Sequence, residues 1–237
     1  MMEQANPEIK KTSRWLKLIS AEFLVLLLVM FVSVTIFAYA VNMVFIKKTT
    51  SFDERIFAFT SQHVSTLATN FMVFISFLGK HTFLIPANLT LLAFYFFIRK
   101  NKRLSIRILA LALTSLSLMF LLKLSFQRSR PDIPLLEKVS GFSFPSGHAL
   151  MSVAFYGMLI YIVSSEIKTR WVKYSLIIIL SLLIFLIGYS RIYLRVHYAS
   201  DVMAGFAVGF AWLSLSLWLI DKMEKRYLTR RELVSKT

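Results

Sequence analysis

Three short polar stretches interrupt an otherwise apolar chain, and their residue types could carry out chemistry. The most specific stretch is SRIYLRVHYASD, in which His197 and Asp201 are four residues apart. This spacing can place a carboxylate one helical turn from an imidazole. A hydrogen bond from one ring nitrogen to the carboxylate fixes the tautomer and raises the basicity of the other nitrogen. We interpret the pair as a candidate base or nucleophile, with Arg191 as a nearby cation.

The stretch FPSGHAL places a second histidine, His148, at the predicted start of a helix. Pro145 and Ser146 are typical of the residues that begin a helix, and Gly147 lets another group approach the backbone closely. The free N–H groups and partial positive charge at a helix N-terminus favour a bound phosphate. The structural alternative is that Ser146 only caps a span and that His148 is there by chance.

The stretch KLSFQRSRP carries Lys123, Gln127 and Arg130 at positions i, i+4 and i+7. We predict that they share one face of a continuing helix. Pro131 disfavours helix at Arg130, so the helix should end there. The structural alternative is that these cations reach lipid headgroups at the end of a span.

The two histidines and Asp201 are also side chains that bind zinc. Several cations are expected around them, and that surrounding favours an anion with several oxygens over a metal ion. We therefore predict neither a metal nor another cofactor. The cations concerned are Lys123, Arg128, Arg130, Arg191 and Arg195.

These features together indicate phosphoryl transfer. Cations and a helix N-terminus would bind the phosphate oxygens and stabilise the charge of the transition state. The His–Asp pair would supply the attacking nitrogen, and the second histidine would protonate the leaving oxygen. The chain has no cysteine, which excludes a thiolate nucleophile, a thiolate metal site and a disulfide framework.

The composition predicts an integral membrane protein. Of its 237 residues, 57% are hydrophobic, whereas soluble domains have about 45–50%. A net charge of +16 would suggest nucleic acid as the partner of a soluble protein. Here the basic residues cluster between apolar runs, so we assign them to membrane orientation and anionic lipid headgroups, and predict no nucleic-acid partner.

Six apolar runs, each near the ~20 residues that a transmembrane helix requires, predict an all-α membrane protein with six transmembrane helices. The runs are 18–46, 82–98, 104–122, 148–164, 172–189 and 202–220. Segment 62–79 mixes polar residues with apolar ones at helical spacing, which predicts an amphipathic interfacial helix between spans one and two.

We predict a single domain over residues 1–237, with a motif-bearing core of about 50–220 and basic tails at 1–17 and 221–237. Ala38-Tyr39-Ala40 resembles a signal-peptidase site. Because the apolar run continues to Ile46, we favour an uncleaved anchor.

Charge distribution predicts the topology. Most of the 28 basic residues lie in the two tails, the second-to-third connection and the fourth-to-fifth connection. Six spans place these four segments on one side, which the positive-inside tendency makes cytoplasmic. Both termini would then be cytoplasmic, and all three polar stretches would meet at the outer ends of the spans.

The three stretches, taken in order, resemble the three-part motif of the type 2 phosphatidic acid phosphatase superfamily, which includes lipid phosphate phosphatases. The matching patterns are Lys123-x6-Arg130-Pro131, Pro145-Ser146-Gly147-His148 and Ser190-Arg191-x5-His197-x3-Asp201. The resemblance implies a metal-independent phosphatase with a phosphohistidine intermediate. It implies that His197 is the nucleophile, Asp201 its orienting partner and His148 the acid. The implied phosphate cradle is Lys123, Arg130, Ser146, Gly147 and Arg191.

The resemblance further implies a lipid mono- or diphosphate as substrate. Undecaprenyl diphosphate, phosphatidylglycerophosphate and phosphatidic acid are candidates, and cleavage would occur at the outer face of a bacterial cytoplasmic membrane. The alternative is a non-enzymatic phospholipid carrier or scramblase, which would need the cations but not the spaced histidines. No oligomeric state is predicted.

Two further features have open interpretations. Arg195 stands where Gly is frequent in the bacterial versions of the motif, and Ala199 where Pro is frequent; Arg195 could contact a second phosphate or an acidic headgroup. Loop 132–144 is rich in apolar residues. It could line a lateral entrance for lipid chains, or it could only cover the bundle.

Overall fold

The structure is a computed structural model that describes residues 7–135 and 139–234. Within these ranges every regular element is a helix. The elements are α1 (Pro7–Val41) continued by the π-helical turn η1 (Asn42–Ile46), α2 (Ser51–Ser61), α3 (Thr66–Leu78), α4 (His81–Ala93) continued by the π-helical turn η2 (Phe94–Ile98), α5 (Lys102–Phe126), α6 (Gly147–Glu166), α7 (Arg170–Tyr193) and α8 (Ala199–Val234).

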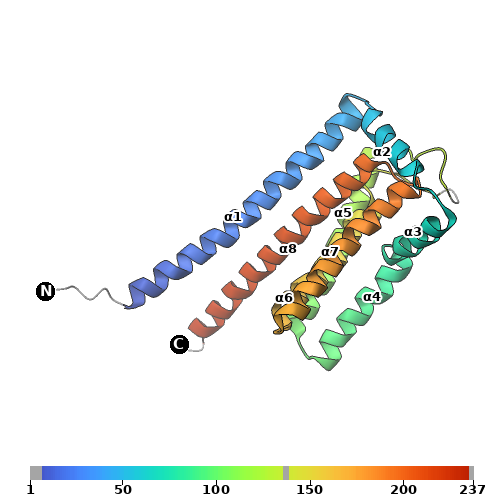
Figure 1. The fold of residues 1–237 in the computed structure, drawn as a ribbon. Helices are drawn as coiled ribbons and strands as arrows, with labels where there is room; N and C mark the ends of the chain where they lie inside the picture. The colour runs from blue at the N-terminus through green and yellow to red at the C-terminus, as the bar shows by residue number, and fades with distance from the viewer. Residues whose placement is uncertain (1–6, 136–138, 235–237) are drawn as a thin grey trace.

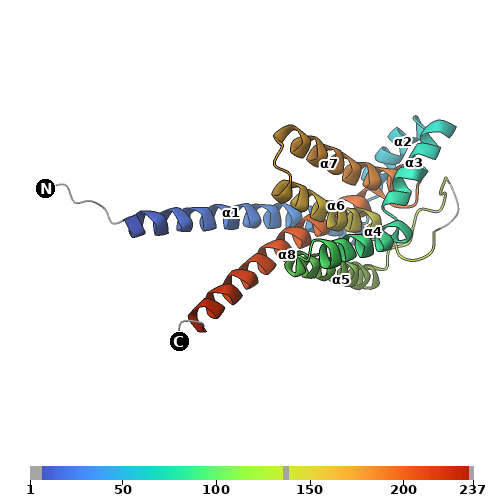
Figure 2. The same ribbon diagram turned by 90° about the horizontal axis from the view of Figure 1, so that it is seen from below.

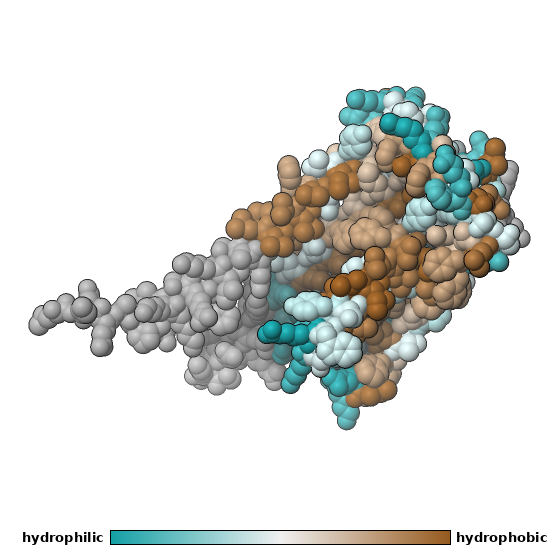
Figure 3. Space-filling model, in the orientation of Figure 1, coloured by the Kyte–Doolittle hydropathy of each residue, from teal (hydrophilic) through white to brown (hydrophobic). Residues whose placement is uncertain are grey.

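Six of these helical segments are long and apolar enough to cross a membrane, which confirms the predicted number of spans. They are Phe23–Ile46, His81–Ile98, Lys102–Phe126, Gly147–Glu166, Arg170–Tyr193 and Ala199–Glu224. Hydrophobic side chains cover the middle of the face in Figure 3, and hydrophilic side chains gather at its two ends. This distribution is the one expected of a protein that lies across a bilayer.

Helix α6 forms the centre of the bundle. It packs against α5, α7 and α8, while α1 lies along α8 on the outside (Figures 1 and 2). Of the most apolar part of α6, 56% is buried, compared with 11% for the span formed by α4 and η2. The N-terminus of α6, which carries His148, is therefore enclosed by neighbouring helices.

Two glycines of α8 allow its close approach to α6. A Cβ on Gly205 would lie 2.6 Å from the carbonyl oxygen of Ser146, and one on Gly209 would lie 2.8 Å from Cβ of Val153. Glycines four residues apart are common where transmembrane helices pack closely. At the end of this contact the N–H of Ser146 donates to the carbonyl oxygen of Asp201 at 2.9 Å, so α6 and α8 begin side by side.

The start of α1 and the end of α8 lie at one end of the molecule, and α2 and α3 lie at the other (Figure 1). Of the predicted tails, residues 1–6 and 235–237 lie outside the described residues. Helix α3 begins four residues later than the start of segment 62–79, because Ser65 caps it by accepting from the N–H of Ala68 at 3.3 Å. Its position at the membrane interface stays a prediction. Helix α2 was not predicted.

The prediction of a continuous helix to Arg130 was wrong. Helix α5 ends at Phe126, where Gln127 adopts a left-handed conformation with φ of 44°. The Gln127 side chain donates to the carbonyl oxygen of Leu124 at 2.9 Å and is exposed. Lys123 is therefore in the last helical turn, whereas Arg130 lies in the following extended segment and reaches the same region by a different route.

Candidate active site

All eight predicted site residues lie at the end of the bundle that carries α2 and α3. They come from the last turn of α5, the segment after it, the first turn of α6, the last turn of α7 and the start of α8. The residues are Lys123, Arg130, Ser146, Gly147, His148, Arg191, His197 and Asp201. Gln127, from the same polar stretch, points away from them.

The start of α6 has the geometry expected of an anion-binding helix terminus. Ser146 is the N-cap, and its hydroxyl accepts from the N–H of Ala149 at 3.5 Å. A Cβ on Gly147 would lie 2.7 Å from Sδ of Met119 and 3.6 Å from Cε of Lys123. Because glycine has no side chain, Lys123 can approach the exposed N–H groups of the first turn.

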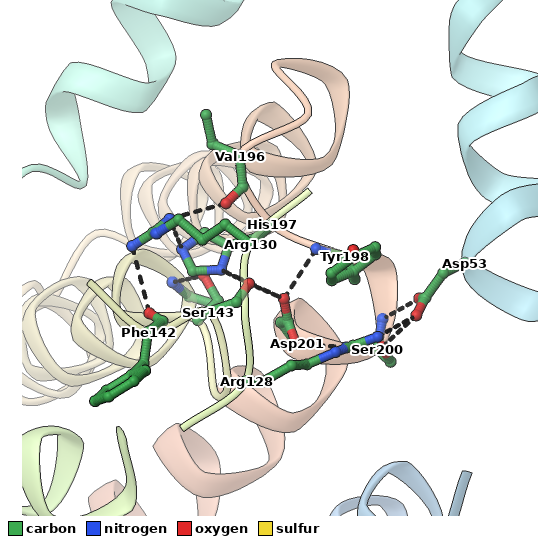
Figure 4. A network of polar contacts seen from close by, with 12 residues as sticks. Asp53, Arg128, Arg130, Phe142, Ser143, Val196, His197, Tyr198, Ser200 and Asp201 are labelled. Atoms are coloured by element: carbon green, nitrogen blue, oxygen red, sulfur yellow. Dashed lines mark hydrogen bonds and ion pairs between the residues drawn. The ribbon is translucent and has the colours of Figure 1, made fainter. Parts of the chain in front are cut away.

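The His–Asp pair is buried and contains a third member. His197 Nδ1 lies 3.5 Å from Oδ2 of Asp201. The hydroxyl of Ser143, a residue absent from the predicted site, lies 3.2 Å from Nδ1 and makes a short hydrogen bond to Oδ2 of Asp201. Since a hydroxyl can donate to the carboxylate and accept from the ring, this arrangement favours a proton on Nδ1 (Figure 4). The lone pair is then on Nε2.

Burial lowers the pKa of His197 to about 4; the contact with Asp201 opposes this shift, and the cations Arg130 and Arg191 reinforce it. Because the pKa is lowered, the imidazole ring stays neutral as the pH falls and becomes protonated only near pH 4. At neutral pH the ring is therefore uncharged, which a nucleophilic nitrogen requires. Nη1 of Arg130 lies 3.2 Å from Nε2, so an arginine stands where the reacting phosphate would bind.

Backbone carbonyl groups hold the cations in place. Nζ of Lys123 donates to the carbonyl oxygen of Phe142 at 2.5 Å, and Arg130 reaches the same oxygen at 3.4 Å. Arg130 also donates to Val196 and Gly141 at 2.8 and 2.9 Å. These bonds fix Lys123 and Arg130 side by side although they come from different segments.

Arg191 holds an unused donor at the site. Its side chain donates through Nη1 to the hydroxyl of Ser76 on α3, while its buried Nε has no partner among the described residues. A buried donor without an acceptor is costly, and most such groups in proteins are satisfied. An anion bound beside Arg191 would supply the missing acceptor.

A cavity of about 390 Å³ extends from these polar groups between α4 and α5. His148, His197, Lys123 and Arg130 line its polar end. The remaining wall is mostly apolar, and several of its residues also lie on the outer surface of the bundle. These include Ile85, Leu89, Leu109 and Leu113, whose side chains are exposed. The cavity therefore opens sideways, where lipid would surround the protein.

The turn between α3 and α4 forms one wall of the site. A Cβ on Gly79 would lie 2.5 Å from Cγ2 of Ile187 and 3.1 Å from Cδ2 of His148. The hydroxyl of Tyr156 donates to the carbonyl oxygen of Leu78 at 2.9 Å and holds the turn against α6. Gly79 thus leaves the space that the imidazole occupies. Its only signal in the sequence is a glycine at the end of an apolar run.

The described residues of loop 132–144 pack over the bundle, and a lateral entrance for lipid chains stays a prediction. Its residues 136–138 lie outside the described residues, and none of the others lines the apolar cavity. Leu135 packs against the buried residues Tyr193, Leu194 and Val196, and Phe144 packs between α1 and α8.

Arg195 has φ of 54°, a left-handed conformation that glycine adopts more readily. This explains why glycine suits the position. The Arg195 guanidinium donates to the hydroxyl of Ser61 on α2 at 2.5 Å.

The donor groups around the histidines do not form a metal-binding set. Within 23–135 and 139–224, whose side chains the structure describes, no three His, Asp or Glu side chains are close enough together to hold a metal ion. Asp201 already accepts hydrogen bonds from Arg128, Ser143 and the N–H of Tyr198. Metal independence of the reaction stays a prediction.

Residues 103–225, more than half of the chain, match the PAP2 superfamily. The chain therefore belongs to this superfamily, as its three motifs indicate.

Its relatives include phosphatidylglycerophosphatase B of Bacillus subtilis (strain 168), which is 32% identical over 155 residues covering 65% of this chain and 76% of the relative. An undecaprenyl-diphosphatase of Sulfolobus acidocaldarius is 27% identical over 169 residues, which cover 69% of this chain and 75% of the relative. The crystal structure of a transmembrane PAP2-type phosphatidylglycerolphosphate phosphatase from Bacillus subtilis matches with a TM-score of 0.73 and 27% identity, covering 83% of this chain and 96% of that one. These relatives are phosphatases.

Proposed function

We propose that the chain is a membrane lipid phosphatase that cleaves a lipid mono- or diphosphate through a phosphohistidine intermediate. One observation carries this proposal: the cluster of two histidines and several cations borders an apolar cavity that opens between α4 and α5. A soluble phosphate ester would need the cluster but not the cavity. A lipid phosphate needs both, because its headgroup and its chain have opposite solubilities.

The phosphate would bind among Lys123, Arg130, Arg191 and the N-terminus of α6. Arg130 would leave Nε2 of His197 and donate to a phosphate oxygen instead, which frees the nitrogen lone pair. Nε of Arg191 would gain an acceptor. Three cations and a helix N-terminus favour the charge that the phosphoryl oxygens carry in the transition state.

In the first step Nε2 of His197 would attack phosphorus, so that a P–N bond forms as the P–O bond to the lipid breaks. His148 would give its proton to the leaving oxygen. Asp201 and Ser143 would stabilise the proton on Nδ1 as the ring becomes positively charged. The lipid alcohol, or lipid monophosphate from a diphosphate, would remain in the apolar cavity.

In the second step a water molecule would give a proton to His148 and attack phosphorus, and the P–N bond would break. Inorganic phosphate and neutral His197 would result. His148 therefore serves first as acid and then as base, which returns both histidines to their starting state.

The names of the relatives support phosphatidylglycerophosphate and undecaprenyl diphosphate as candidate substrates, with phosphatidic acid as a third. The test is release of inorganic phosphate from each of these lipids by purified protein, with and without EDTA and orthovanadate. We expect release that survives EDTA and falls with vanadate, an analogue of five-coordinate phosphorus. Loss of activity on chelation that zinc or magnesium restores would contradict the histidine mechanism. Binding of all three lipids without release would favour a carrier or scramblase.

We further propose that the site faces the outside of a bacterial cytoplasmic membrane and that both tails are cytoplasmic. The clustering of basic residues in the tails and in the α6–α7 connection supports this orientation. The chain has no cysteine, so single-cysteine variants report position cleanly. In intact cells a membrane-impermeant thiol reagent should label Ile133→Cys but not Lys168→Cys; both residues are exposed. The reverse pattern would place the site on the cytoplasmic side.

Filling the apolar cavity should separate lipid substrates from soluble ones. Ala112 lines the cavity, so Ala112→Trp should lower kcat/KM for a long-chain lipid phosphate by about 10²-fold or more, because a misplaced substrate commonly loses that much. The rate with p-nitrophenyl phosphate should change little. Ala110→Trp, on the same helix but outside the cavity lining, is the matched control. Equal loss for both substrates would show that the cavity does not hold the lipid chain.

A further inference from the structure

A buried network links the His–Asp pair to α2, a helix outside all three motifs. Arg128, in the segment after α5, lies at its centre. Nη1 donates to Oδ1 of Asp201 at 2.7 Å and to the hydroxyl of Ser200 at 2.8 Å, and Nη2 donates to Oδ2 of Asp53 at 2.9 Å. The guanidinium carbon also lies 4.0 Å from the centroid of the Tyr198 ring. One arginine therefore joins two carboxylates from different helices (Figure 4).

The hydrogen-bond partners of Asp53 are Arg128 and Ser200, rather than the histidines or the phosphate cradle. Asp53 is 2% exposed, and its Oδ1 accepts from the N–H of Ser200 at 2.9 Å, while Oδ2 accepts from the Ser200 hydroxyl at 2.8 Å. Asp53 thereby fixes both the start of α8 and the Nη2 group of the Arg128 guanidinium. A buried ion pair is stabilising only when its geometry is good and its remaining hydrogen-bonding groups have partners. The Arg128–Asp53 pair meets both conditions, because Ser200 also donates to Asp53.

The two oxygens of Asp201 have separate partners. Oδ1 faces Arg128, whereas Oδ2 faces Ser143, the N–H of Tyr198 and Nδ1 of His197. Asp201 is fully buried, so its charge needs a nearby cation. Without Arg128, the closest group able to become that cation is His197. A protonated His197 could not act as a nucleophile.

We infer that Arg128, anchored by Asp53, is a positioning residue that balances the charge of Asp201 and so keeps His197 neutral while Asp201 still orients it. This inference rests on the proposed function. Both terminal nitrogens of Arg128 already donate to Asp201, Ser200 and Asp53, so we do not assign Arg128 to the phosphate cradle. Helix α2 then belongs to the catalytic assembly through Asp53.

Charged and titratable groups from five different segments surround His197. Arg130 from the segment after α5 and Arg191 from α7 face it and oppose its protonation, and Asp201 from α8 favours it. His148 from α6 and Lys123 from α5 line the same cavity. All of these remain in an Arg128 variant, so a change in the protonation of His197 can be assigned to the loss of Arg128.

The test uses Arg128→Gln and the double variant Arg128→Gln/Asp53→Asn. The single variant leaves two buried carboxylates without a cation and is expected to melt at a lower temperature. The double variant removes one of those charges and should recover much of that loss. Arg55→Gln and Glu54→Gln, exposed neighbours on α2, are the matched controls and should behave like the unsubstituted protein.

In both Arg128 variants kcat should fall up to about 10-fold at pH 6, because a change in a nearby charge typically shifts a pKa by roughly 1–3 units. The loss should shrink as the pH rises, since His197 becomes neutral again above its raised pKa. KM should stay within a few-fold. A double variant that melts normally and keeps kcat at pH 6 would overturn the inference, as would an increase in KM at constant kcat.

A second readout does not depend on turnover. The chain has four histidines, so NMR titration of ¹⁵N-histidine protein in detergent can follow His197, identified by the signal that His197→Ala removes. The His197 signal should titrate at a higher pH in both Arg128 variants than in the controls. If it does so while the unsubstituted protein cleaves no lipid, the proposed function fails and the charge balance stands. An unchanged titration overturns the charge balance itself.

Discussion

His197→Ala is expected to abolish turnover of every phosphate substrate, lipid or soluble, and to abolish the phosphoenzyme. The reason is chemical: without Nε2 no P–N bond can form, and the other groups of the site cannot replace it. Removal of a covalent nucleophile lowers kcat by about 10⁶-fold in a well-studied hydrolase, which sets the scale. The measurement is phosphate release, with a thermal melt to show that the variant is folded.

The control for this variant is His63→Ala. His63 is exposed, and its ring contacts the carbonyl oxygen of Phe59 rather than the catalytic groups, so its substitution should leave the rate unchanged. A folded His197→Ala protein that turns over near the normal rate would disprove the assignment of the nucleophile and reopen the carrier alternative.

His148→Ala is expected to cause a loss that depends on the leaving group. General acid catalysis typically contributes ~10²–10⁴-fold, and this is the loss we expect for a lipid alcohol, whose alkoxide is a poor leaving group. With p-nitrophenyl phosphate the first step needs no acid, so the loss should be much smaller. The measurement compares single-turnover rates of phosphoenzyme formation with the two substrates.

One outcome of that comparison would contradict the assignment of His148 as the acid. If the loss is the same for both substrates, His148 binds the phosphate rather than protonating the leaving oxygen. Gly79→Ala offers a related test, because its added methyl group would clash with Ile187 and also press on the His148 ring. It should lower the rate for the lipid more than for p-nitrophenyl phosphate.

The six spans could be predicted because a bilayer requires long, continuous apolar helices. The ends of those helices depend on single residues with weaker signals. Gln127 ends α5 in a left-handed conformation that glutamine rarely adopts, so no pattern in the sequence marks that position. Helix α2 is short and contains few apolar residues in a row, and only its burial against α7 and α8 explains it.

That the core residues of the candidate site lie close together could be predicted because they belong to short motifs with fixed internal spacing; their catalytic roles stay predictions. The supporting residues could not, because they are brought together by the fold. Asp53 is 147 residues from Ser200, which it binds, and Ser76 is 115 residues from Arg191. Ser143 was the easiest of these to find from the sequence, since it lies between two phenylalanines, two residues before Pro145.

The central claim is that His197 carries the phosphoryl group during turnover. The most direct measurement is rapid-quench trapping with lipid labelled by ³²P on its phosphate, followed by proteolysis and mapping of the labelled peptide. We predict acid-labile, base-stable label on His197 of the unsubstituted protein. With ³²P-labelled p-nitrophenyl phosphate, more label should accumulate in His148→Ala, because hydrolysis of the phosphoenzyme lacks its base. Label on another residue, or rapid phosphate release with no labelled protein at any time, would contradict the account.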